Sequence, residues 1–141
     1  MLTKANKVDL KKYIGIWHQI SSFPAWFQNG CKDVTAEYKP VDGKVSVLNT
    51  CKYKNGFKTT AKAKAFPVKN NVLSVSFFPL INADYIIEFV DTGYEYAVVG
   101  STGKKYLWIL ARKKVMEKEV YDYLVKVAEK KGYDVSRLVK S

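Results

Sequence analysis

The sequence predicts an all-β fold, an eight-stranded antiparallel up-and-down β-barrel with one C-terminal α-helix packed outside it. The first observation is a hydrophobic period of two along most of the chain, interrupted by turn residues roughly every eight to twelve positions. The second is a single late segment in which the period becomes helical. Short Asp-Gly and Asn-Gly turns favour hairpins between consecutive strands, and closing such a meander into a barrel removes its exposed edges.

Length and composition are those of a folded single-domain protein. The 141 residues, 48% hydrophobic and 26% charged, are expected to form one domain over residues 1–141. No apolar run reaches the roughly 18 residues that a membrane-spanning helix requires. The start lacks the apolar stretch of a signal peptide, so we expect either a cytosolic protein or a chain whose leader has been removed.

Each expected strand is a run of alternating side chains bounded by turn residues. The strands are expected at residues 15–23, 34–39, 44–54, 58–66, 72–78, 84–90, 94–100 and 106–113. Short turns join them at 42–43, 55–56, 70–71, 92–93 and 102–103, whereas a longer loop rich in apolar groups follows the first strand. The barrel is therefore expected over about residues 13–114.

The helix is expected over about residues 116–131, with a C-terminal extension over 132–141. Val120, Leu124 and Ala128 recur at helical spacing, and Gly132 is placed to end the helix. Because only one face of this helix is apolar, we expect it to lie against the outside of the barrel.

The inner face of the middle strands is unusually small. In KTTAKAKAF the lysines share one face, while Ala61, Ala63 and Ala65 share the other. A solid β core normally needs larger inward residues, so this row predicts unfilled volume inside the barrel. The alternative is that large residues from opposite strands reach across and fill it. The preceding strand repeats the pattern, which places a band of lysines outside.

The charge is strongly positive. The formal net charge is +11, and no acidic residue lies between Asp42 and Asp84. The resulting field suits a nucleic acid, an anionic membrane surface or an acidic small molecule, and solubility alone is the alternative. Of the 24 basic residues only Arg112 and Arg137 are arginine, which counts against bidentate reading of bases or phosphates.

Three segments resemble the ordered sequence signatures of the lipocalins: Gly15-Ile16-Trp17, DTGYEYAVVG at 91–100 and YLWILAR at 106–112. The resemblance is strongest to the bacterial outer-membrane lipocalins, and the chain is similar also to apolipoprotein D and the plant temperature-induced lipocalins. It spans about residues 8–138. Two departures are His18, where a Tyr is more usual, and a loop before Asp84 without a Gly-rich turn.

The resemblance implies a lipocalin calyx with a closed base and an open mouth. Trp17 and Arg112 are expected to meet at the base, where a guanidinium over the indole forms a structural pair rather than a ligand contact. Counting alternate residues from this pair places Leu110, Trp108, Gln19 and Ser21 inside. His18 is expected on the outer face.

The open mouth is expected to gather the long first loop and the ends of several strands. Trp26 and Phe27, with Phe23 just below, are expected to line or cover this entrance. Composition alone leaves Cys31 and Cys51 as either one disulfide or two buried thiols. Their placement at the mouth favours the disulfide, although a regular register would pair Cys51 with Val34, so the loop must fold back.

The predicted function is to bind, and to carry or scavenge, a small hydrophobic ligand in an apolar calyx. The resemblance implies a fatty acid or a lysophospholipid, and the lysines near the mouth favour an anionic head. The alternative is a basic barrel that binds nucleic acid or an anionic membrane surface through its lysine band. The expected ligand-binding residues are Trp26, Phe27, Val45, Val47, Asn49, Ala61, Ala63, Leu73, Val75, Phe77, Tyr85, Ile87 and Trp108.

An enzyme is not expected, because the single histidine lies on the outer face and no nucleophile has a partner base. No cofactor, no metal site and no nucleic-acid partner are expected. The chain is expected to be a monomer or a weak dimer. The resemblance implies a location in the cell envelope, at the outer membrane or in the periplasm, or secretion, and a cytoplasmic location stays open.

Overall fold

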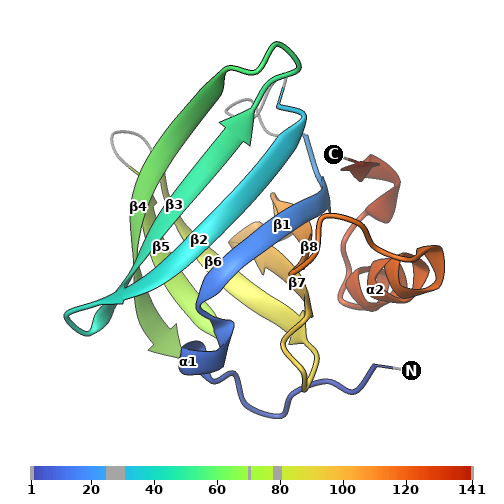
Figure 1. Ribbon diagram of the computed structural model, residues 1–141. Coiled ribbons are helices and arrows are strands. Elements are labelled where there is room, and N and C mark those ends of the chain that lie inside the picture. The colour runs from blue at the N-terminus through green and yellow to red at the C-terminus, as the bar shows by residue number, and fades with distance from the viewer. Residues whose placement is uncertain (1, 25–30, 70, 78–80, 141) are drawn as a thin grey trace.

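The computed structural model describes residues 2–24, 31–69, 71–77 and 81–140. Antiparallel strands close into a barrel, a short ninth strand is added at one edge, and one long helix lies outside (Figure 1). The all-β barrel with an outer C-terminal helix is thus confirmed. The strands are β1 (Gly15–Ser22), β2 (Asp33–Val41), β3 (Lys44–Lys52), β4 (Lys58–Lys69), β5 (Val72–Phe77), β6 (Ile81–Val90), β7 (Tyr96–Ser101), β8 (Leu107–Ala111) and β9 (Val139–Lys140).

Helical segments occupy the ends of the chain and one turn. Helix α1 (Leu10–Tyr13) precedes β1, helix α2 (Lys118–Lys130) follows β8, and two short 3-10 turns are η2 (Thr102–Lys104) and η3 (Val135–Arg137). The Asp9 carboxylate caps α1 by accepting from the Lys11 amide. Gly132, with φ of 98°, ends α2, and the Tyr133 amide then donates to the Ala128 carbonyl as in a Schellman motif.

Strand β1 closes the barrel, because it pairs with β2 on one edge and with β8 on the other. The β1–β2 pairing runs only from Gly15 opposite Tyr38 to His18 opposite Thr35. Above that point β1 pairs with β9, where Ser21 lies opposite Lys140. The two-residue β9 therefore covers the part of β1 that β2 leaves unpaired.

A β-bulge changes the direction of the side chains in β1. Gln19 lies opposite Leu110, but Ser21 lies opposite Ile109, so Ile20 is the extra residue. After the bulge, Ser21 points to the outer side, where its Oγ is 3.0 Å from the Tyr121 hydroxyl of α2. The expectation that Ser21 points inward is wrong for this reason, because alternation from Trp17 holds only as far as Gln19.

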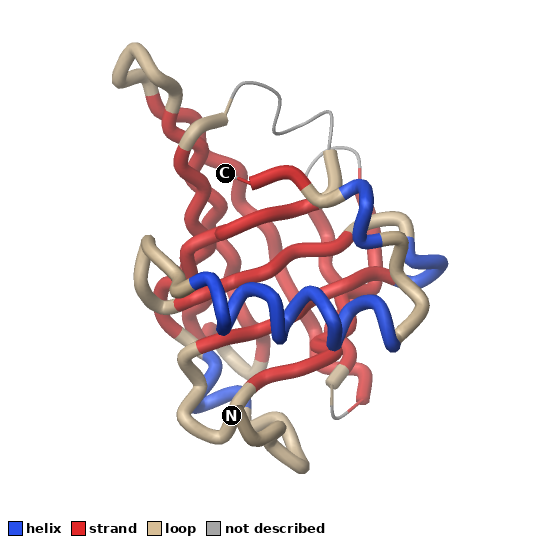
Figure 2. Tube along the Cα trace, turned by 90° about the vertical axis from the view of Figure 1, so that its right-hand side faces the viewer, coloured by secondary structure: helices blue, strands red, loops and turns tan. Residues whose placement is uncertain are grey.

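Two separate hydrophobic clusters hold the molecule together. The inner cluster lies inside the barrel and includes Trp17, Tyr13 and Tyr38. The outer cluster lies between the barrel wall and α2, where Leu124 and Ala128 are completely buried. Figure 2 shows α2 lying across the outer face of the strands. Phe23 belongs to the outer cluster, so the expectation that it lies just below the mouth lining is also wrong.

The remaining differences concern element ends. Strand β4 continues past the expected end through Pro67 to Lys69, and β8 ends at Ala111 rather than at residue 113. Helix α2 begins two residues later than expected and ends one residue earlier. Helix α1 and strand β9 are too short to show a hydrophobic period, and β9 is held by its pairing with β1.

Candidate ligand-binding site

The base of the barrel is closed by Arg112, the residue that follows β8. Its guanidinium carbon lies 3.8 Å from the centre of the Trp17 ring. Its nitrogens donate to the backbone carbonyls of Lys12, Tyr13, Ile14, Ile16 and Tyr94 at 2.9–3.2 Å. Trp17 itself is fully buried, and its Nε1 donates to the Tyr13 carbonyl at 2.8 Å. One side chain thus links the α1 segment to β1 and to the turn after β6.

A layer of tyrosines lies above this base. The Tyr13 ring contacts the Trp17 ring at a centroid distance of 5.1 Å and the Tyr38 ring at 5.2 Å. Burial raises the pKa of Tyr38 to about 12, and its hydrogen bond with the Tyr13 side chain lowers that pKa in part. Burial also raises the pKa of Tyr13 well above its ordinary value, as does the nearby Tyr38. These hydroxyls therefore stay protonated inside the barrel at neutral pH.

Buried side chains of the described residues form one hydrophobic cluster through the middle of the barrel. Ala63 and Ala65 are 5% and 0% exposed and belong to the inner cluster together with the large rings of the base. The rings of Tyr13 and Tyr38 belong to the same buried cluster, which favours the alternative interpretation of the alanine row, in which large residues reach across the barrel. Eight of the expected ligand-binding residues lie in this cluster: Val45, Val47, Ala63, Leu73, Val75, Tyr85, Ile87 and Trp108.

A small cavity with both apolar and amide groups in its wall borders the inner cluster. Its volume is about 30 Å³, which suits water-sized molecules and is far below the several hundred Å³ of a typical ligand site. Its amides are those of Gln19 and Asn49. The lining residues are Gln19, Val34, Thr35, Ala36, Tyr38, Asn49, Tyr85, Val99, Trp108 and Leu110. Asn49, Tyr85 and Trp108 were expected ligand-binding residues, and Gln19 and Leu110 were expected to point inward.

Three aromatic rings form a stack at the cavity. The centroids of Tyr85 and Trp108 are 4.8 Å apart, and Tyr106 stacks on the other side of Trp108 at 5.6 Å. Tyr85 and Trp108 are 9% and 6% exposed, whereas Tyr106 is half-buried. Burial raises the pKa of Tyr85 well above its ordinary value, and the negative forms of Tyr38 and Tyr106 raise it further. The stack therefore occupies volume in which a larger ligand could lie only after these rings rotate.

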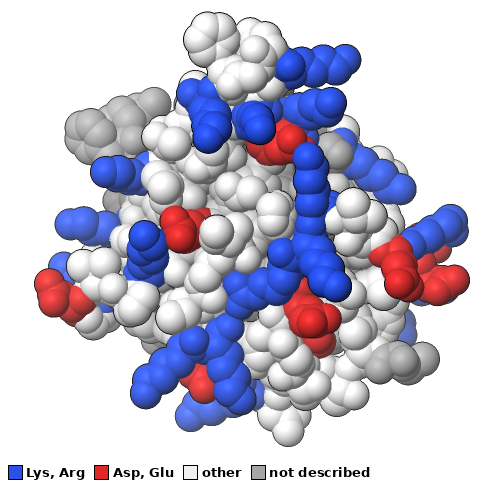
Figure 3. All heavy atoms as spheres, in the orientation of Figure 1, with Lys and Arg blue, Asp and Glu red and all other residues white. Residues whose placement is uncertain are grey.

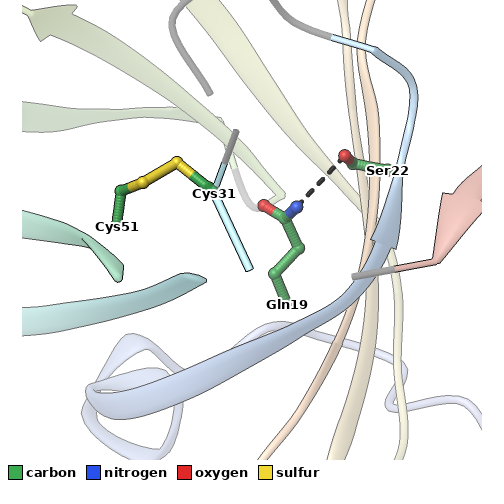
Figure 4. The surroundings of a disulfide bond; sticks show 4 residues. All are labelled: Gln19, Ser22, Cys31 and Cys51. Atoms are coloured by element: carbon green, nitrogen blue, oxygen red, sulfur yellow. Dashed lines mark hydrogen bonds between the residues drawn. A yellow bond between two sulfur atoms is a disulfide. The ribbon is translucent and has the colours of Figure 1, made fainter. Parts of the chain in front are cut away.

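The disulfide between Cys31 and Cys51 is present at the mouth (Figure 4). It joins the segment before β2 to the end of β3, and Gln19 points toward the same region from β1. The Gln19 Nε2 donates to the Ser22 Oγ at 3.1 Å, so the amide is oriented. The regular register pairs Cys51 with Val34, as expected, and Cys31 reaches Cys51 by folding back from beyond that pair.

The remaining residues that were expected at the mouth do not all lie there in the described structure. Ala61 lies opposite Asn49 on the inward side of β4 and is exposed, so it belongs to the open end of the barrel. The backbone of Phe77 in β5 pairs with that of Ala63 in β4. Trp26 and Phe27 lie outside the described residues.

Strand β2 contributes cavity residues that the sequence interpretation missed, namely Val34, Thr35, Ala36 and Tyr38. Alternation could have identified the inward members, because Ala36 lies directly opposite Trp17 and Tyr38 lies two positions further along β2. Tyr13 was missed for another reason. It belongs to a four-residue helix, and only the tertiary structure shows that this helix closes the base.

Comparison with known families decides what this barrel is. The family model described as a lipocalin-like domain matches residues 8–141. The chain belongs to the lipocalin family.

Several proteins resemble this lipocalin over nearly its whole length. Temperature-induced lipocalin-1 of Arabidopsis thaliana is 37% identical, over 95% of this chain and 78% of its own. The outer membrane lipoprotein Blc of Escherichia coli strain K12 is 33% identical, over 98% and 81%. Apolipoprotein D of Mus musculus is 32% identical, over 92% and 74%. The resemblance to these three kinds of lipocalin is thus confirmed.

Solved structures confirm the fold. Lobster apocrustacyanin A1 superposes with a TM-score of 0.79 at 17% identity, covering 99% of this lipocalin and 89% of its own chain. Insecticyanin from the tobacco hornworm Manduca sexta gives 0.77 at 23% identity, covering 100% and 84%. At such low sequence identity, these two structures support the barrel architecture alone.

Family membership supports the binding of a small hydrophobic ligand, since lipocalins are generally ligand-binding carriers rather than enzymes. Within the described part of the chain, no group of three or more His, Cys, Asp or Glu side chains could hold a metal ion. None of the helices described here is both long and apolar enough to span a bilayer.

Proposed function

We propose that this lipocalin binds, and carries or scavenges, a single-chain amphiphile such as a fatty acid or a lysophospholipid. One observation carries the proposal: the upper barrel holds a cavity whose wall is mainly apolar and aromatic, with the amides of Gln19 and Asn49 as its polar points. An acyl chain matches such a wall, and a carboxylate or phosphate head can accept hydrogen bonds from amides.

Binding of an acyl chain requires the aromatic stack to move. A cavity of about 30 Å³ cannot hold a fatty acid, whereas rotation of Tyr85, Tyr106 and Trp108 would join their volume to it. Buried residues of the inner cluster, among them Val47 and Val75, then form the floor that limits how deep the acyl chain reaches. On this proposal the ligand lies in the upper half of the barrel, and Trp17 at the base never touches it.

The lysines near the mouth favour a negatively charged head. Lys52, Lys54 and Lys58 are exposed on the outside of the hairpin that borders the mouth, so they act on the head through their field rather than by contact. Charge reversal at the three positions is therefore expected to weaken binding of an anionic fatty acid and to reduce its salt dependence. Unchanged affinity across salt concentrations would refute this part of the proposal.

The location proposed for this lipocalin is outside the cytoplasm. Blc of Escherichia coli is by name an outer membrane lipoprotein, and a disulfide such as Cys31–Cys51 persists in oxidising compartments. We therefore propose the cell envelope or secretion, with a cell-envelope lipid as the source of the ligand.

The test uses a fluorescent fatty-acid probe and a matched pair of variants on β4. Ala61→Trp adds a large ring on the inward side of the mouth without disturbing the packed core, whereas Lys62→Trp adds the same ring to the outer face one position later. The proposal requires that the first variant loses at least about tenfold in affinity and the second less than twofold. Equal affinities would show that the probe binds outside the barrel.

A further inference from the structure

The hairpin between β3 and β4 extends beyond the rest of the barrel as a basic tip with an apolar end. We call residues 52–58 the hairpin tip. Phe57 is 71% exposed there, and Lys52, Lys54 and Lys58 around it are all exposed. In Figure 1 this hairpin is the most protruding part at the top of the view, and Figure 3 shows blue side chains gathered below its uncharged end.

The turn that carries Phe57 is held by hydrogen bonds. The Tyr53 amide donates to the Phe57 carbonyl at 2.9 Å, and the Gly56 amide donates to the Tyr53 carbonyl at 3.0 Å. The Phe57 amide donates to the Asn55 side chain at 3.1 Å. Gly56 has a φ of 90°, a conformation that side-chain-bearing residues rarely adopt. A defined turn therefore presents the exposed ring, at little further cost in conformational entropy on binding.

The charges of the hairpin tip are not neutralised within the described parts of the chain. Lys52 lies directly opposite Lys58 in the β3–β4 ladder, an arrangement of like charges that is unfavourable without a counterion. No ion pair joins either lysine, or Lys54, to an acidic group there. Asp33, which faces Lys52 from β2, is 3.1 Å from Lys114. The tip thus offers several free ammonium groups to an external anion.

We propose that the hairpin tip docks onto the surface of an anionic lipid bilayer, with Phe57 inserted among the headgroups and the lysines in contact with the lipid phosphates. An exposed aromatic ring beside basic residues is the combination that binds to membrane interfaces. Each lysine near an anionic surface contributes about fivefold in affinity. Arginine, which would favour nucleic acid, is absent from the tip, because Arg112 and Arg137 lie elsewhere and contact Trp17 and Phe23.

Docking by this tip would turn the mouth of the barrel toward the bilayer. Lys52 follows Cys51 directly, and the Lys32 amide donates to the Lys52 carbonyl at 2.9 Å, so the tip and the mouth form one unit. The opposite end also carries exposed lysines, among them Lys4, Lys7 and Lys11, so charge alone does not decide which end faces the bilayer. The inference concerns this outer surface and does not depend on which ligand the barrel holds.

The experiment measures sedimentation of the protein with vesicles of phosphatidylcholine containing 30% phosphatidylglycerol, and with vesicles of phosphatidylcholine alone (about 0.1 M salt). The tip variant is Lys52→Glu/Lys54→Glu/Lys58→Glu. Its matched control, Lys4→Glu/Lys7→Glu/Lys11→Glu, makes the same change in net charge with exposed lysines of the N-terminal segment. Phe57→Ser is matched by Val41→Ser, which removes an exposed apolar residue at the opposite end of the barrel.

The proposal expects binding to the anionic vesicles only, a loss of at least about 100-fold in the tip variant and less than about fivefold in its control. Phe57→Ser is expected to lose about five- to tenfold, and Val41→Ser nothing measurable. Equal losses in the two charge variants would overturn the proposal, because binding would then follow net charge alone. Tighter binding to a double-stranded oligonucleotide than to the vesicles would also overturn it. Probe binding by the tip variant, measured with a neutral amphiphile, reports separately on the barrel.

Discussion

Removal of the Arg112 side chain tests how the base of the barrel is closed. Arg112→Met keeps the aliphatic stem but removes the guanidinium that stacks on Trp17. Three of its backbone contacts, to Tyr13, Ile14 and Tyr94, are partly buried, and Tyr13 keeps its bond from the Trp17 indole. Two carbonyls are therefore left under-satisfied at about 1 kcal/mol each, and the lost cation–π contact adds about 1–2 kcal/mol.

The expected loss is thus about 3–4 kcal/mol in the free energy of unfolding, or about 10–15 °C in melting temperature for a domain of this size. Urea and thermal unfolding followed by circular dichroism measure it. Arg112→Lys keeps the charge but not the planar fork, so we expect about half of the loss. Lys113→Met, which removes the neighbouring exposed cation, is the control and is expected to change little. A loss below about 1 kcal/mol for Arg112→Met would refute the interpretation of this side chain as the structural closure of the base.

Three further predictions concern stability. The Cys31–Cys51 disulfide closes a loop with a sequence separation of 20, so Cys31→Ser/Cys51→Ser is expected to lose about 3 kcal/mol in urea unfolding, and a loss under 1 kcal/mol would contradict the disulfide's stabilising role. Because burial raises the pKa of Tyr38 to about 12 from 10.0, its stabilising contribution is complete below pH 10 and is lost as the pH rises from 10 to 12. Urea midpoints measured over this range should therefore fall, and a flat profile would contradict the buried position of the hydroxyl. Leu124→Ala on α2 removes a fully buried side chain and should cost about 2–5 kcal/mol, whereas the exposed Lys126→Ala should cost almost nothing.

The sequence carried enough information to predict the barrel, because hydrophobic alternation, Gly-containing turns and signature segments all agree on it. The meeting of Trp17 and Arg112 was equally accessible, since both lie at the ends of strands that a meander brings to the same end of the barrel. The inward direction of Asn49, Tyr85 and Trp108 could also be predicted from alternation, because no bulge precedes these residues in their strands.

The directions of Ser21 and Phe23 could not be predicted from alternation. The bulge after Gln19 reverses every following side chain of β1, and no residue in the stretch HQISSF marks it. The residues after the bulge contact distant segments: the Tyr121 hydroxyl of α2 donates to Ser21, and Arg137 lies 4.6 Å from the centre of the Phe23 ring. A local pattern cannot contain information about such partners.

How much of the barrel interior is filled by side chains could not be predicted from the sequence, for a different reason. The small inward residues of β4 predict space only if nothing crosses the barrel from the other side. Ala63 and Ala65 lie in the same cluster as Tyr13 and Tyr38, whose rings come from α1 and β2. Whether rings of that size meet the alanines depends on strand register and on the position of α1, and neither is fixed by the alternation within one strand.

The binding of one amphiphile molecule inside the barrel is the central claim, and native mass spectrometry tests it most directly. The protein would be stripped of lipid, incubated with an excess of a fatty acid or a lysophospholipid, and compared with Ala61→Trp and with its outer-face control Lys62→Trp. The account predicts one bound lipid on the wild-type protein and on the control, and none on Ala61→Trp. No bound lipid on the wild-type protein, or equal occupancy of all three, would contradict it.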